Sequence, residues 1–109
     1  MSSVMSKTML SEPRRQLLEL MQTINFGQIV NLPVRNGQPV INEQTGVFRV
    51  IKFGGDNRVR PEIARADFVL KDPVCELMAQ LETLGNGVLR LIEIQHGLPF
   101  RMTLEGIAA

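Results

Sequence analysis

The sequence predicts an α+β fold: two αββ units around a mainly antiparallel sheet of about five strands, with two helices packed on one face. The main observation is a repeat. When residues 72–101 are moved back by sixty positions onto residues 12–41, without a gap, six identical residues coincide. They are Pro73 with Pro13, Leu77 with Leu17, Thr83 with Thr23, Gly87 with Gly27, Gly97 with Gly37 and Pro99 with Pro39. Because they fall at helix starts, apolar stripes, chain breaks and hairpins, we interpret the pattern as an internal duplication.

The second observation is a globular composition. Of the 109 residues, 44% are hydrophobic and 21% are charged, which is typical of a folded domain. No apolar run approaches the roughly 20 residues that span a membrane, so we expect no membrane association. We expect a disordered tail over residues 1–10 and one domain over 11–109, with repeat units 12–41 and 72–101 joined by a connector, 42–71.

The first unit begins with a helix. Ser11 or Glu12 can cap it, and Pro13 occupies the first turn, where its missing N–H costs nothing. An apolar stripe with helical spacing follows, formed by Leu17, Leu20, Met21 and Ile24. Residues 28–34 then alternate as a half-buried strand, with one face formed by Val30, Leu32 and Val34. Asn36-Gly37 turns the chain back into a second strand.

The connector contains a third strand. Residues 47–53 carry apolar side chains on both faces of an extended chain. A strand of this type is buried on both sides, so we expect it to lie centrally in the sheet or to be covered.

The second unit repeats the design of the first. Asp72 and Pro73 start a helix that Gly85 ends. The last strand alternates, and its inner face consists of Leu98, Phe100, Met102 and Leu104. Two registers are open for the hairpin at His96-Gly97. A two-residue loop pairs Ile92 with Arg101. A three-residue loop pairs Ile92 with Phe100, and we favour it because it buries more apolar surface.

The residues that carry most chemistry are scarce. Cys75 is the one cysteine and His96 the one histidine, so neither an intrachain disulfide nor a thiolate metal cluster can form. A lone thiol favours a reducing, cytoplasmic location. His96 occupies the place of Asn36 in the repeat, and we interpret it as a turn residue at positive φ. With no GxSxG, HExxH or GxxxxGK[ST] motif, we expect no enzyme and no cofactor.

The leading functional hypothesis is association. In the three-residue register, Leu89 and Leu91 face away from the inner row of the sheet and need a cover. We therefore expect a small non-enzymatic module that forms a homo-oligomer, a dimer in the simplest case, or binds a partner protein.

The alternative is a nucleic-acid or phosphate-binding protein that uses the basic loop 52–65. This loop presents Lys52, Arg58, Arg60 and Arg65. The backbone N–H groups of Gly54-Gly55 could complete an anion site with these side chains. Nucleic acid is not the favoured partner, because a net charge of +1 gives no global field that attracts a polyanion.

Overall fold

A computed structural model describes residues 5–105 and confirms the α+β class, with two α-helices and a mainly antiparallel five-stranded sheet. Two short 3-10 helices complete the elements of this part of the chain. Their order is η1 (Lys7–Met9), α1 (Glu12–Ile24), β1 (Gly27–Arg35), β2 (Gln38–Pro39), β3 (Gly46–Arg49), η2 (Pro61–Ala64), α2 (Asp72–Leu84), β4 (Gly87–Gln95) and β5 (Leu98–Glu105).

Both helices begin and end close to the residues that their sequences predict, but Asp72 is the first residue of α2 and not its cap, and Lys71 before it makes no side-chain capping bond. The Ser11 hydroxyl oxygen accepts a hydrogen bond from Arg14 N–H (3.4 Å), and each helix has a proline in its first turn. The residues that follow them, Asn25 (φ 60°) and Gly85 (φ 68°), adopt positive φ and donate their N–H to a carbonyl one turn earlier, at 3.0 Å in both cases. This ends the helix with its last carbonyl groups partly satisfied.

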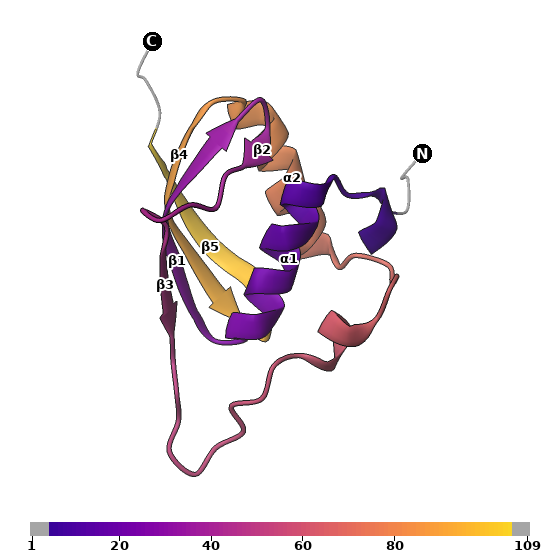
Figure 1. The fold of residues 1–109 in the computed structure, drawn as a ribbon, viewed down its shortest axis with the longest axis vertical. Coiled ribbons are helices and arrows are strands. Elements are labelled where there is room, and N and C mark those ends of the chain that lie inside the picture. The colour runs from indigo at the N-terminus through magenta and orange to yellow at the C-terminus, as the bar shows by residue number, and fades with distance from the viewer. Residues whose placement is uncertain (1–4, 106–109) are drawn as a thin grey trace.

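The sheet has the order β2-β1-β4-β5, and β3 pairs with β1 as well. At its centre β1 and β4 run antiparallel, with Ile29 opposite Ile92 and Leu32 opposite Leu89. Figure 1 shows α1 and α2 on the same side of this sheet, and no element within residues 5–105 covers the opposite face. β3 pairs only with β1 among the described strands, so it is an edge strand. The expectation of a central or doubly covered third strand is wrong.

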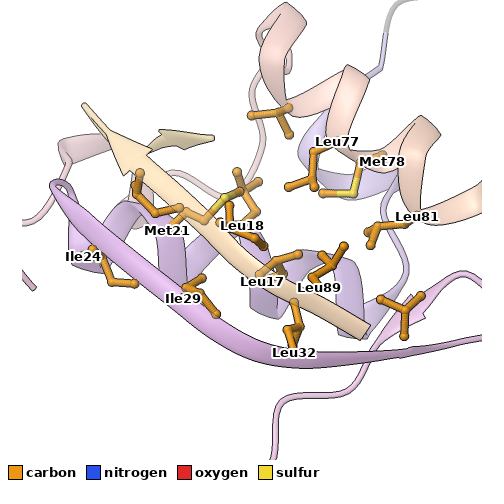
Figure 2. Packing of buried hydrophobic residues seen from close by; sticks show 14 of the residues in the cluster. Leu17, Leu18, Met21, Ile24, Ile29, Leu32, Leu77, Met78, Leu81 and Leu89 are labelled. Atoms are coloured by element: carbon orange, nitrogen blue, oxygen red, sulfur yellow. The ribbon is translucent and has the colours of Figure 1, made fainter. Parts of the chain in front are cut away.

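The core lies between the helices and the inner face of β1 and β4 (Figure 2). Its fully buried side chains come from both residues 12–41 and residues 72–101, so neither segment encloses a core alone. The residues without exposed surface are Leu17, Met21, Ile29, Leu32, Leu81, Leu89 and Ile92. At about 1.5–3 kcal/mol for each buried aliphatic side chain, this cluster supplies most of the driving force for folding.

Residue alternation switches in the middle of both central strands. Asn31 has φ 55°, which breaks the strict alternation of β1, so Ile29 and Leu32 both face the core while Val30 is only half-buried. In β4, a register shift against β5 at Arg90 likewise places Leu89 and Ile92 on one face. The expected faces, with Val30 inside and Leu89 outside, are therefore wrong.

The second hairpin has neither of the two expected registers. His96 (φ 54°) and Gly97 (φ 71°) form a two-residue turn, with Gln95 opposite Leu98. An irregularity between Glu93 and Ile94 then shifts the pairing, so that Ile92 lies opposite Met102 rather than Arg101 or Phe100. The bulge leaves the Phe100 side chain 62% exposed.

Residues 5–10 belong to the folded domain, contrary to the expected disordered tail; residues 1–4 of that tail lie outside the described part of the chain. Lys7 N–H donates to the Phe68 carbonyl (3.0 Å), and its ammonium group donates to the Arg65 carbonyl (3.0 Å). The side chain is buried and also lies 3.6 Å from a carboxylate oxygen of Glu19. These contacts hold η1 against α1 and the connector.

The helices and central strands occur at a common offset. α2 and β4 begin and end sixty residues after α1 and β1. Two contacts between the halves have the same offset: Gly37 N–H donates to the Gly85 carbonyl (2.8 Å), and Gly97 N–H donates to the Asn25 carbonyl (2.9 Å). Each hairpin turn therefore binds the end of the other unit's helix.

Candidate association surface

The feature that stands out from this fold is the segment that follows the sheet edge, which we call the arm: residues 46–60, comprising β3 and the loop after it. In Figure 1 the arm continues past the end of the sheet and returns to the helical layer. The loop after β3 is fixed at both of its ends near the C-terminal end of α1. Val50 N–H donates to the Phe26 carbonyl (2.7 Å), and Arg60 N–H donates to the Gln22 carbonyl (3.0 Å).

The tip of the arm is held by its own hydrogen bonds. Asn57 bridges the loop, because its side-chain oxygen accepts from Lys52 N–H (2.9 Å) and its side-chain nitrogen donates to the Lys52 carbonyl (2.9 Å). Gly55 N–H donates to the same carbonyl (3.0 Å). An asparagine that replaces backbone partners in this way gives a loop a defined shape without a hydrophobic core. The arm is therefore preorganised.

The arm exposes more large apolar side chains than any other segment of comparable length in residues 5–105. Val59 is 42% exposed, and the other five lie within residues 47–53, where Phe53 at the tip is 100% exposed and four more are 48 to 58% exposed. They are Val47, Phe48, Val50 and Ile51. Single exposed apolar residues are normal on protein surfaces, whereas five large ones within seven consecutive residues are a concentration of the kind found at interaction sites.

The basic residues predicted for an anion site lie in or beside the arm, but most have an internal partner. Arg58 forms an ion pair with Asp56 (2.9 Å), and Arg60 forms one with Glu62 (3.3 Å). Lys52 lies 5.5 Å from the centre of the Phe26 ring, and Arg65 lies 5.9 Å from the centre of the Phe68 ring. Arg58 and Arg60 line one pocket, and Lys52 and Arg65 do not line it.

The backbone donors of the same loop are also used. Gly55 N–H donates to the Lys52 carbonyl, and Arg58 N–H donates to a carboxylate oxygen of Asp56 (3.0 Å). Side-chain and backbone hydrogen bonds from Arg58 lower the pKa of Asp56 to about 2. An acid held ionised beside Arg58 competes with any incoming phosphate for that guanidinium.

The two predicted interface leucines have different positions. Leu89 has no exposed surface and packs in the core, so its assignment to an interface is wrong. Leu91 is half-buried and pairs with Val30 on the uncovered face of the sheet. The apolar surface that sequence reasoning expected at Leu89 lies instead on the arm, whose two-faced apolar pattern was the available signal.

The scarce chemical side chains have structural surroundings. The His96 ring packs edge-on against Phe26, with 4.7 Å between ring centres, and the residue has the positive φ of a turn. The thiol of Cys75 is half-buried and faces the Leu70 carbonyl at 3.9 Å. Within residues 5–105, no three His, Cys, Asp or Glu side chains are grouped so that they could hold a metal ion.

Comparison of the chain with family models, curated proteins and solved structures gives no match. No helix in the described part has the length and apolar character needed to cross a membrane.

Proposed function

We propose that this protein is a non-enzymatic association module that joins a second copy of itself by burying the apolar side chains of the arm. The observation that carries the proposal is the five-residue apolar group at positions 47–53, exposed on a segment whose conformation is already fixed by Asn57. Preorganisation lowers the entropy cost of binding, and burial of Phe53 and its neighbours provides the driving force.

The experiment compares two substitutions of the same type at similar exposure. Val50 and Val69 are 53% and 63% exposed, but only Val50 belongs to the arm. We expect the wild type and Val69→Asp to elute as oligomers in light-scattering chromatography, and Val50→Asp to elute as a folded monomer. An aspartate in the buried contact would be left without a partner, which is strongly unfavourable. Circular dichroism checks that each variant is folded.

Binding of a nucleic acid or another polyanion is the second candidate. Residues 46–60 contain four basic residues and one acidic residue, a net charge of +3, whereas the whole chain carries +1. The remaining residues therefore carry −2, and the positive charge is concentrated on the arm. A monomeric wild type whose retention on heparin falls with salt, and is lost in Arg58→Ala/Arg60→Ala, would favour this function over association.

We also infer that the two αββ units arose by duplication and that the protein acts in the cytoplasm. The common offset of sixty residues in helices, central strands and crossed hydrogen bonds supports the duplication. The single, half-buried thiol of Cys75 supports the reducing compartment. Cell fractionation tests the location: we expect the protein in the cytoplasmic fraction, with the Cys75 thiol free of disulfide.

A further inference from the structure

We propose that the arm of one copy binds in the groove between α2 and β5 of a second copy, and that reciprocal exchange closes a dimer. The inference rests on the proposed function and names the receptor for the arm. The groove has a volume of about 160 Å³. Leu77 of α2 and Met102 of β5 lie among its apolar residues, with Pro73 and the exposed ring of Phe100.

The position of the groove favours an extended occupant. β5 pairs only with β4 among the described strands, so its outer edge is open beside a helix. A groove between an edge strand and a helix is the arrangement that accepts an added strand in several peptide-binding domains. Pro99 has no N–H to offer and Phe100 is bulged, so the N-terminal half of this edge would bind through side chains rather than through a regular ladder.

The arm has the complementary properties. It is extended over β3, turns at Phe53-Gly54, and presents apolar side chains together with a net positive charge. Glu76 lines the groove, while the one cation there, Arg101, is already hydrogen-bonded to Glu93. The groove therefore offers an apolar floor and a carboxylate to an apolar and basic segment, and such complementarity fixes orientation and partner choice.

The sheet topology makes the contact intermolecular. The arm leaves the sheet beyond β1, whereas β5 forms the opposite edge, with β1 and β4 between them. One chain cannot place its own arm in its own groove without breaking this order. Two copies that exchange arms occupy both grooves and leave no open end, whereas one-way exchange would produce chains that grow with concentration.

A matched pair of substitutions on β5 tests the receptor. Phe100 lines the groove and Leu104, on the same strand, does not; they are 62% and 41% exposed. We expect Phe100→Asp to weaken the dimer by a factor of roughly 30 or more and Leu104→Asp to change it little, because only the first places a charge in the apolar contact. Analytical ultracentrifugation measures both constants, and circular dichroism confirms folding.

Mixing two monomeric variants gives the decisive result. Phe53→Asp damages the arm and keeps the groove, whereas Phe100→Asp keeps the arm and damages the groove. A mixture restores one intact contact, so we expect a heterodimer in a solution where each variant alone is monomeric. Failure of the mixture to associate, or a dimer unaffected by Phe100→Asp, overturns the groove while leaving association through the arm in place. A wild type that is monomeric at all concentrations overturns both.

Discussion

The pairing of β3, where the arm begins, with β1 depends on Gly27, which lies opposite Arg49. Replacing Gly27 by alanine is the sharpest test of this close approach. A Cβ atom at Gly27 would lie 2.0 Å from the Phe48 carbonyl oxygen and 3.0 Å from Arg49 Cα. Both are backbone atoms of β3, so no side-chain rotation can relieve the contact. β3 would have to move away from β1 by more than about 1 Å, since non-bonded carbon atoms pack at about 3.5–4.0 Å.

The magnitude follows from two opposing effects. Overpacking costs about 1–3 kcal/mol, and each hydrogen bond lost from the β1–β3 ladder costs a further 0.5–1.5 kcal/mol or so. Loss of glycine flexibility in the unfolded chain returns about 0.4–1 kcal/mol. We expect a net cost of about 2 kcal/mol, and a melting temperature lower by roughly 8–16 °C for a domain of this size.

Gly87→Ala is the matched control, because Gly87 is the counterpart of Gly27 at the start of β4. Its Cβ atom would meet Leu84 Cδ1 at 2.9 Å, the end of a side chain that can rotate, and its nearest backbone atom, the Glu105 carbonyl oxygen, lies at 3.3 Å, which a small shift relieves. We expect little change in melting temperature. Hydrogen exchange provides the local measurement: Gly27→Ala should remove protection from the amides of β3 and leave those of β4 protected. Equal melting temperatures for the two variants, with β3 still protected, would refute the close approach at Gly27.

Two further predictions concern the core and the arm. Leu81→Ala should lower the free energy of unfolding by about 2–5 kcal/mol, because Leu81 has no exposed surface, and the half-buried Leu84→Ala should cost clearly less in denaturant melts. In carbon-detected NMR, the Asp56 carboxyl group should titrate with a pKa of about 2. In Arg58→Ala this pKa should rise toward its ordinary value of 3.8. Since the folded pKa lies below the unfolded one, the Asp56–Arg58 contact stabilises the folded state above pH 3.8 and is lost as the pH falls through about 2. An Asp56 pKa that is unchanged in Arg58→Ala would contradict that cause.

The sequence by itself predicted the elements whose signals are local. Pro13 and Pro73 mark the first turns of α1 and α2, and the apolar stripes identify the faces that pack on the sheet. Asn36-Gly37 and His96-Gly97 adopt positive φ in two-residue turns. For Asn36-Gly37, the residue types alone predict such a turn. These features depend on backbone preferences within a few residues, so one chain segment contains the necessary information.

The tertiary structure decided which faces of those elements are covered. Leu89 belongs to the core because Asn31 and Arg90 interrupt the alternation of two paired strands at the same level, an event that a period of two cannot predict. The bulge at Phe100 likewise depends on how β5 meets β4.

The apolar pattern of residues 47–53 predicted a strand that is central or covered on both faces, and this is wrong because no pattern within the segment states what lies beside it. Coverage is a property of neighbours in space: β1 protects one edge of β3, and within residues 5–105 nothing packs over Phe53. Local preferences therefore determined the helices and turns of this protein, whereas burial, register and the exposed arm follow from long-range packing, whose partners lie far apart in the chain.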